Sequence, residues 1–156
     1  MCKWQEELEE KLRSGRVIIQ TYSPDNYCIE QAKEQNYESF FETEIAIRKQ
    51  LNYPPFCDII LFNINSIDET EIEKAGQKIY RILENNSKKL KSNVVIFKPV
   101  QSPINKIKNK YRWRIIVKCR LNNNVIDLVN NTLEDFYKLK YKKTTVIVDV
   151  NPNSMM

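Results

Sequence analysis

The chain contains no histidine and only two glycines, Gly15 and Gly76, among its 156 residues. Without histidine, the commonest general base and most nucleophile triads are excluded. Two isolated glycines also exclude a glycine-rich loop of the kind that binds nucleotide phosphates. The sequence therefore contains no complete catalytic apparatus, and we predict that this chain has no catalysis of its own.

The sequence also lacks zinc-binding spacings and long hydrophobic runs. Its four cysteines (Cys2, Cys28, Cys57 and Cys119) form no C-x-x-C pair, and without histidine the usual zinc sites are excluded. No run approaches the roughly 20 apolar residues of a membrane span, and the first residues have no apolar signal core. We therefore expect a cytoplasmic protein with reduced thiols, without a cofactor and without membrane contact.

Acidic residues are missing from one long segment, Asn85 to Ile126, which holds eight lysines and three arginines. By contrast, residues 1–84 carry ten basic and sixteen acidic side chains. A basic segment of this length without carboxylates predicts an anionic partner, such as the phosphate backbone of a nucleic acid.

The clearest strand, Tyr111 to Arg120, lies within this basic segment. Because side chains alternate along a strand, one face holds the apolar set Tyr111, Trp113, Ile115, Val117 and Cys119. The other face holds Arg112, Arg114, Lys118 and Arg120, interrupted by Ile116. Cations two residues apart on a strand are about 6.5–7 Å apart, close to the phosphate spacing of an extended nucleic-acid strand. The alternative interpretation is an ordinary solvated face of a half-buried strand.

The remaining pattern from residue 57 onward alternates strands and helices. We predict strands at 58–64, 94–97, 111–120 and 144–150, a helix opened by the capping box Asp68-x-x-Glu71 and running to about residue 89, and a helix after residues 122–124. Residues 101–110, with Lys106, Lys108 and Lys110, are expected to form a loop. This β-α-β-β-α-β order is that of an α+β, ferredoxin-like antiparallel sheet with two helices on one face.

The position of the aromatic residues indicates how such a sheet would meet a nucleic acid. RNA-recognition domains of this topology carry stacking aromatic residues on the face away from the helices. Here Tyr111 and Trp113 belong to the face that we assign to the core. We therefore expect contact with backbone phosphates, or with an acidic protein partner, rather than stacking on bases.

Residues 1–56 are expected to be an N-terminal helical segment with one short strand. The predicted elements are a charged helix at 3–13, a strand at 17–21, a short helix from the N-cap Ser23-Pro24 to about residue 33, and a longer helix at 37–51 that ends before Tyr53-Pro54-Pro55-Phe56. We divide the chain into residues 1–14, a charged helix of its own; 15–56, a strand and helices with a connector; and 57–156, the α+β domain.

Four stretches resemble the C-terminal portion of bacterial primosomal protein N′, the replication-restart helicase family. The run from Gly15 to Pro24 (G-R-V-I-I-Q-T-Y-S-P) is similar to the strand that closes the second helicase lobe of that family. The helix entering Tyr53-Pro54-Pro55-Phe56 resembles the segment leading to the C-terminal domain. Tyr111-Arg112-Trp113-Arg114 is similar to the family's Y-R-W-Q strand, and Val148-Asp149-Val150-Asn151-Pro152 resembles its closing D-V-D-P.

The chain departs from this family before Gly15. The G-R-x-G-R helicase motif, the nucleotide-binding lobe and the paired zinc-binding cysteines of the family are absent. The resemblance therefore implies a piece that corresponds to the C-terminal portion, with 15–56 as a remnant of helicase lobe 2. ATP hydrolysis, DNA unwinding and the ATP and zinc sites are not assigned to this chain.

The resemblance implies recognition of branched DNA at abandoned replication forks and contact with the acidic C-terminal tail of single-stranded-DNA-binding protein. Our first hypothesis is a non-catalytic domain that binds fork DNA through seven cations: Lys106, Lys108, Lys110, Arg112, Arg114, Lys118 and Arg120. A second is a protein-interaction module for that acidic tail, near Lys118, Arg120 and the helix with Val125. A third is a scaffold domain that packs on the helicase core, which exposed apolar side chains on residues 17–51 would favour.

Overall fold

The computed structural model describes residues 17–153, in two compact units of residues 17–51 and 52–153. The helix predicted for residues 3–13 and the segment 1–14 lie outside the described residues. Within the described chain no helix is long and apolar enough to cross a membrane. The division at residue 57 that the sequence suggests, with a separate ancestry for 15–56, stays a prediction.

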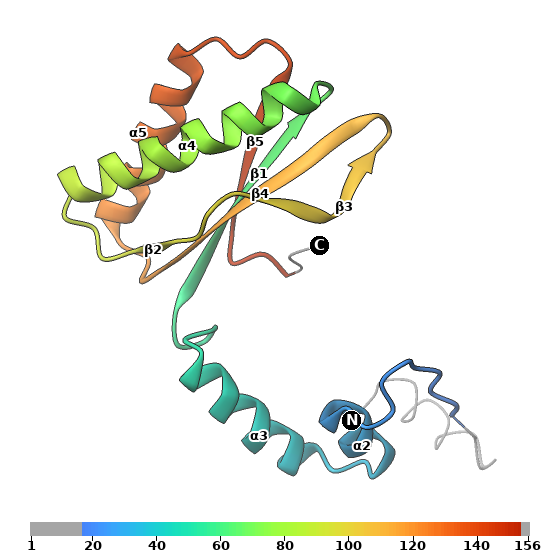
Figure 1. Ribbon diagram of the computed structural model, residues 1–156. Helices are drawn as coiled ribbons and strands as arrows, with labels where there is room; N and C mark the ends of the chain where they lie inside the picture. Colours follow the sequence, from blue (N-terminus) through green and yellow to red (C-terminus); the bar gives the residue numbers. More distant parts are fainter. Residues whose placement is uncertain (1–16, 154–156) are drawn as a thin grey trace, which may run out of the picture. The chain divides into compact units, whose positions relative to one another are not determined.

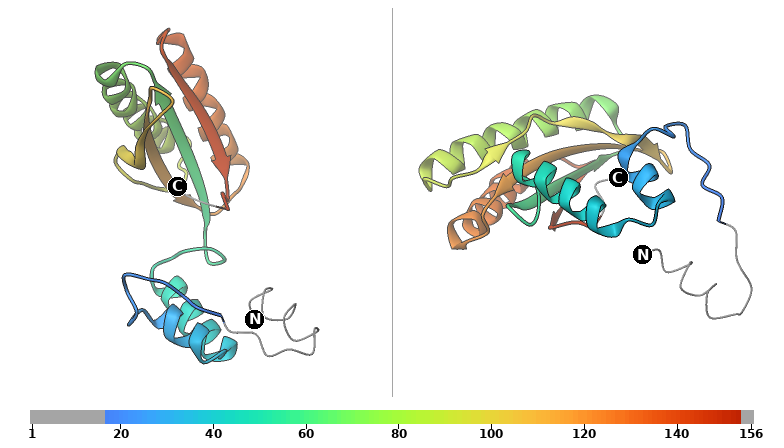
Figure 2. Two further views of the ribbon diagram at one scale, coloured as in Figure 1. Left: turned by 90° about the vertical axis from the view of Figure 1, so that its right-hand side faces the viewer. Right: turned by 90° about the horizontal axis from the view of Figure 1, so that it is seen from below.

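The unit from residue 52 onward is a five-stranded antiparallel sheet with two helices on one face (Figures 1 and 2). Its elements follow in the order β1 (Asp58–Ser66), α4 (Glu69–Lys89), β2 (Val95–Ile96), β3 (Val100–Ile107), β4 (Lys110–Cys119), α5 (Asn123–Lys138) and β5 (Thr144–Val150). The strands lie in the order β2-β4-β1-β5, and β3 also pairs with β4. This arrangement confirms the predicted ferredoxin-like α+β fold.

The core lies between the sheet and the two helices. Inward-facing side chains of β1 and β4, such as Phe62, Ile64 and Ile115, are fully buried against α4 and α5. The alternation read from β4 is confirmed, since Val117 and Cys119 are also buried while Tyr111 and Trp113 are half-buried at the margin of the core. Burial of large aliphatic and aromatic side chains is the main stabilising contribution in such a unit.

Helix α4 lies close to the sheet at Gly76, which is buried. A Cβ atom at this position would lie 3.3 Å from the Cβ of Pro99 and 3.6 Å from Cε3 of Trp113. The absence of a side chain therefore allows the helix to approach the point where β2 and β3 separate, although glycine disfavours a helix interior.

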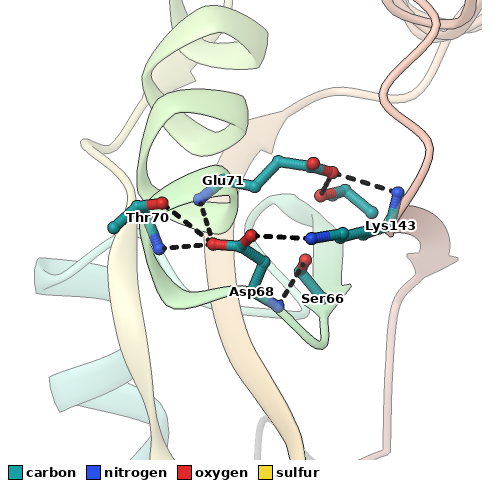
Figure 3. A network of polar contacts seen from close by, with 6 residues as sticks. Ser66, Asp68, Thr70, Glu71 and Lys143 are labelled. Atoms are coloured by element: carbon teal, nitrogen blue, oxygen red, sulfur yellow. Dashed lines mark hydrogen bonds and ion pairs between the residues drawn. The ribbon is translucent and has the colours of Figure 1, made fainter.

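The start of α4 is tied to the start of β5 by a polar network (Figure 3). Asp68 is the N-cap and accepts hydrogen bonds from the backbone N–H groups of Thr70 (3.1 Å) and Glu71 (3.2 Å). Glu71 does not complete a capping box: its Oε1 accepts from the Lys143 N–H (3.1 Å) and the Thr144 hydroxyl (2.7 Å). The Lys143 ammonium lies 3.1 Å from Asp68 Oδ2.

These contacts lower the pKa of Asp68 to about 2. The hydrogen bond from the Thr70 hydroxyl (2.9 Å) is the largest cause, followed by those from the Lys143 ammonium and the Glu71 N–H, and all of them favour the ionised carboxylate. Two elements distant in sequence are thereby joined at one end of the sheet.

The expected loop at residues 101–110 is wrong, because most of it is strand β3. A two-residue turn at Lys108 and Asn109 joins β3 to β4, and both residues have positive φ (48° and 61°). That pattern is typical of the type I′ turn that matches the twist of a hairpin. Pro103 is accommodated because the register shifts between Gln101 and Lys106, which leaves an irregular stretch inside an edge strand.

Residues 17–51 hold the helices α2 (Tyr27–Lys33) and α3 (Tyr37–Gln50), neither of which has a buried residue. Their N-caps are Asn26 and Asn36, so the predicted cap at Ser23-Pro24 is wrong. The rings of Tyr27 and Phe40 stack with their centroids 6.4 Å apart, and the Tyr27 hydroxyl donates to Glu44.

The predicted strand at residues 17–21 is also wrong, because no strand forms there. Val17, Ile18 and Ile19 are 52%, 80% and 48% exposed. A β-branched run has a strong preference for sheets, but a strand requires a neighbour to pair with. The β-branched composition of residues 17–21 therefore indicates a preference for a strand, but no pairing strand is found among the described residues.

Candidate nucleic-acid interface

The candidate site lies on the face of the sheet that points away from α4 and α5, here called the second face. On β4 it consists of Lys110, Arg112, Arg114, Ile116 and Lys118, which alternate with the core residues of the same strand. The antiparallel register places Arg114 opposite Asn63 of β1, and Arg112 opposite Asn65. The predicted alternation thus brings four cations into one row.

The cations of this row differ in exposure. Lys110 is exposed at the hairpin end, whereas Arg112, Arg114 and Lys118 are half-buried. Ile59 and Leu61, on the same face of β1, are 5% and 3% exposed. The second face is therefore covered over part of β1 and is not the uniformly open surface that the sequence suggested.

The three lysines of the expected loop surround the tip of the β3–β4 hairpin instead. Lys106 pairs with Tyr111 and shares its face, with its ammonium 4.6 Å above the centre of the tyrosine ring. Lys108 is in the turn, and Lys110 is on the second face. All three are exposed, so the hairpin presents positive charge on both faces and at its tip.

Lys118 lies near two aromatic rings, Tyr53 and Phe97, that were not among the predicted site residues. Its ammonium is 3.7 Å from the centre of the Tyr53 ring and 5.7 Å from that of Phe97. Tyr53 comes from the segment before β1, and Phe97 follows β2, with its N–H donating to the Ile116 carbonyl (2.9 Å). A strand at residues 94–97 was predicted from the sequence, but all four residues are apolar, so only the register of β2 decides which face Phe97 occupies.

Arg120 lies apart from the row, beyond the end of β4, beside Asp58. Asp58 accepts a hydrogen bond from the Leu121 N–H (2.8 Å) and one from the Asn151 side chain (3.0 Å). These bonds, in that order, and then the charge of Arg120 hold the pKa of Asp58 below its usual value. Arg120 therefore lies near the hydrogen bonds by which Asp58 joins the ends of β1, β4 and β5.

The second face also carries one carboxylate, from β5. Asp149 pairs with Leu61 in the register, and its Oδ2 accepts a hydrogen bond from the Asn63 side chain (2.7 Å). The acid-free segment is thus flanked by a negative charge on the far side of β1. The positive charge of the second face therefore lies on β4, away from β5.

The thiols are unsuited to chemistry at this site. Cys57 and Cys119 are 4% and 5% exposed. Burial raises the pKa of the Cys119 thiol to about 11, with smaller contributions from Asp58 and Cys57, so that the reactive thiolate is scarce at neutral pH. Within residues 17–153 no group of three histidine, cysteine or acidic side chains is placed to hold a metal ion.

Comparison with known proteins gives consistent relatives. Residues 49–153 match the family described as the primosomal protein N C-terminal domain. The replication restart protein PriA of Bacillus subtilis is 30% identical over 145 residues, 92% of this chain and 18% of the relative. That of Borreliella burgdorferi is 36% identical over 141 residues, 90% of this chain and 20% of the relative.

A third relative, the replication restart protein PriA of Synechocystis, is 38% identical over 104 residues, 67% of this chain and 12% of the relative. Among solved structures, a de novo designed protein with a ferredoxin fold has a TM-score of 0.41 at 16% identity, covering 62% of this chain and 86% of its own. The chain thus spans a fifth or less of the length of these curated relatives, and it matches their C-terminal domain, not a catalytic region. The chain belongs to the primosomal protein N C-terminal domain family of replication restart proteins.

Proposed function

We propose that this chain is a non-catalytic, DNA-binding and partner-binding domain of the replication-restart machinery, and that it binds the phosphate backbone of forked DNA. The observation that carries the proposal is the β3–β4 hairpin, where Lys106, Lys108 and Lys110 are all exposed around one tip. The segment from Asn85 to Ile126, which includes this hairpin, has no acidic side chain.

The geometry supports backbone contact through the hairpin and the adjacent end of β4. Arg112 and Arg114 continue the row of cations from Lys110, with the two-residue spacing of a strand. A two-stranded ribbon is one of the elements that the grooves of DNA admit. Lys118 and Arg120 contribute less to this surface, because Lys118 contacts two aromatic rings and Arg120 lies beside Asp58.

The test is a fluorescence-anisotropy titration of a labelled three-way fork with the whole chain, at two salt concentrations. Replacing Lys106, Lys108 and Lys110 by glutamate should weaken fork binding strongly. The loss of three phosphate contacts should also lower the slope of log affinity against log salt by about 2–3, at roughly 0.9 per contact.

A matched control changes the same net charge elsewhere. Lys74, Lys78 and Lys142 are exposed and lie outside the acid-free segment, so their replacement by glutamate should leave most of the affinity intact. Equal losses in the two triple variants would indicate a general charge effect and would contradict the proposal. Circular dichroism would verify that both variants are folded.

A second candidate function is packing against a larger protein, such as a helicase core. It is favoured by the exposed apolar side chains of residues 17–51, among them Ile18 (80%), Tyr22 (106%) and Leu51 (55%). Patches of this kind are typical of protein interfaces. Replacing Val17, Ile18 and Ile19 by serine should abolish co-elution with a separately produced helicase core if this candidate is correct.

The acidic tail of single-stranded-DNA-binding protein remains a proposed ligand, and the same titration can include it as a competitor. Displacement of fork DNA by an acidic peptide would indicate one shared basic surface. Fork binding that persists in saturating peptide would separate the two sites.

A further inference from the structure

The edge of the second face combines exposed apolar side chains with cations in two parallel rows. The apolar row follows β2 and β3 and consists of Val95, Phe97 and Val100, which are 55%, 43% and 47% exposed. The cationic row follows β4. Val95 pairs with Lys118 and Val100 pairs with Arg114, so the two rows are neighbours in the register.

Phe97 lies at the centre of this arrangement. Its N–H donates to Ile116, which places it between the Lys118 and Arg114 positions on the second face. The Lys118 ammonium is 5.7 Å from the centre of its ring. The same ammonium is 3.7 Å from the centre of the Tyr53 ring, so a cation contacts a second ring and lies beside the partly exposed Phe97.

Two parallel rows of different chemistry match an unpaired nucleic-acid strand. Such a strand presents bases along one side and phosphates along the other, and proteins that bind it combine aromatic platforms with a positive track. Neighbouring strands of a sheet lie about 4.8 Å apart, so a base on the edge row keeps its phosphate near the β4 row. The side chains of an extended peptide instead alternate between its two sides, which fits two parallel rows less well.

We propose that an unpaired base of single-stranded DNA stacks on Phe97, with its flanking phosphates on Lys118 and Arg114 and with Tyr53 as a positioning residue for Lys118. The proposal departs from the expectation of contact with phosphates or an acidic partner without base stacking, because Phe97 and Tyr53 bring aromatic rings close to Lys118 from outside β4. It rests on the proposed DNA binding and adds a single-stranded segment to the ligand.

The test compares an oligothymidylate with a fully paired duplex by anisotropy, using the whole chain and the variant Phe97→Leu. Leucine keeps an apolar side chain but removes the stacking surface. Oligothymidylate affinity should fall about 5- to 100-fold, the range for one base on one aromatic side chain, while duplex affinity stays unchanged. Phe41→Leu is the matched control, because Phe41 is 50% exposed on α3 and should have no effect.

A second readout locates the contact directly. An oligothymidylate with one iododeoxyuridine should photo-cross-link to Phe97, as identified by mass spectrometry of the digested protein. Unchanged oligothymidylate affinity in Phe97→Leu, or cross-links only at other residues, would overturn the inference. The inference would also be overturned if Phe97→Leu lost binding to an acidic peptide but kept its affinity for the oligothymidylate, since the site would then be a peptide site.

The outcomes separate this inference from the proposed function. If the hairpin lysine variant loses duplex and fork DNA while Phe97→Leu keeps the oligothymidylate, the base-stacking site is refuted and the proposed function stands. If the hairpin variant binds fork DNA like the unchanged chain while Phe97→Leu loses the oligothymidylate, the hairpin contact is refuted and the base-stacking site stands. A chain that binds no DNA refutes both.

Discussion

The two compact units of this chain place their apolar side chains differently. Residues 52–153 bury a continuous core between a sheet and two helices, whereas α2 and α3 of residues 17–51 have no buried residue. Both units contain helices with good caps, such as Asn36 and Asp68. Local helix signals are therefore sufficient for secondary structure in both units, but only one has a hydrophobic core of its own.

Because α2 and α3 bury no residue, we expect residues 17–51 to be less stable than residues 52–153. Helices of ordinary length are marginal in water without an apolar face packed against something else. The contacts within this unit include the ring stack of Tyr27 on Phe40, the hydrogen bond from Tyr27 to Glu44 and the ion pair of Glu44 with Arg48 (2.6 Å), and none of these side chains is buried. Four predictions test this comparison.

The largest expected effect is in native-state hydrogen exchange. Backbone amides of β1 and β4 should exchange only through global opening, with a free energy in the usual range of about 5–15 kcal/mol. Amides of α2 and α3 should exchange through local opening close to 0 kcal/mol. Peptide-resolved mass spectrometry would measure this, and similar protection of the two units would contradict the comparison.

The next effect concerns a pair of phenylalanines. Phe62 is 0% exposed, so Phe62→Ala should lower the free energy of unfolding by about 3–5 kcal/mol. Phe41 is 50% exposed on α3, so Phe41→Ala should change it by less than about 0.5 kcal/mol. Urea titration followed by circular dichroism would measure both, and a Phe41→Ala loss as large as that of Phe62→Ala would refute the prediction.

A smaller effect is expected where α4 approaches the sheet. Gly76→Val adds atoms next to Pro99 and Trp113, where even a Cβ would be 3.3 Å and 3.6 Å away, so overpacking should cost about 1–3 kcal/mol. Ala46→Val on the exposed surface of α3 is the control and should show only the small helix-propensity loss of valine. Thermal unfolding would compare the stability losses of the two variants. A Gly76→Val variant as stable as the unchanged chain would show that the close approach of α4 to the sheet does not require glycine.

The smallest expected effect is electrostatic and depends on pH. The folded-state pKa of Asp68 is lowered to about 2, so its charge stabilises the fold above the ordinary value of 3.8 and this contribution is lost as the pH falls towards 2. Asp68→Asn keeps a good N-cap without the charge. The stability difference between the unchanged chain and this variant should therefore shrink from pH 5 to pH 2.

Glu44→Gln provides the counterpart in the other unit, because the pKa of Glu44 is lowered by hydrogen bonds from Tyr27 and Arg48. If residues 17–51 contribute little to the cooperative unfolding transition, this variant should leave the pH dependence of the main transition unchanged. A pH effect as large as that of Asp68→Asn would show that the two units unfold together.

The sequence predicted the fold where burial alternates strongly. The period-2 pattern of β4 and the helical period of α4, opened by Asp68, were sufficient to identify the ferredoxin-like order. Capping at Asp68 followed from its side-chain chemistry, but Glu71 bonds to Lys143 and Thr144, which the sequence could not show because the bond joins distant elements.

Two of the errors share a physical cause, which is pairing between strands. Residues 17–21 had the composition of a strand but no neighbour to pair with, while residues 101–107 had a proline and a lysine but pair with β4. The turn at Lys108 and Asn109 carried no Asn-Gly signal, although asparagine tolerates positive φ. The position of Phe97 on the second face also follows from the register of β2, which the sequence could not show. Tyr53 reaches Lys118 from the segment before β1, and this contact joins residues distant in sequence.

The interrupted edge of the sheet has a consequence for solubility. Between β2 and β3 the strand breaks at Lys98 and the buried Pro99, and the pairing shifts again around Pro103. A neighbouring molecule could not extend the sheet here by continuous backbone pairing, because prolines offer no N–H and the irregular path breaks the template for fibril growth. Val95, Phe97 and Val100 can therefore stay exposed without making the domain prone to aggregate through this edge.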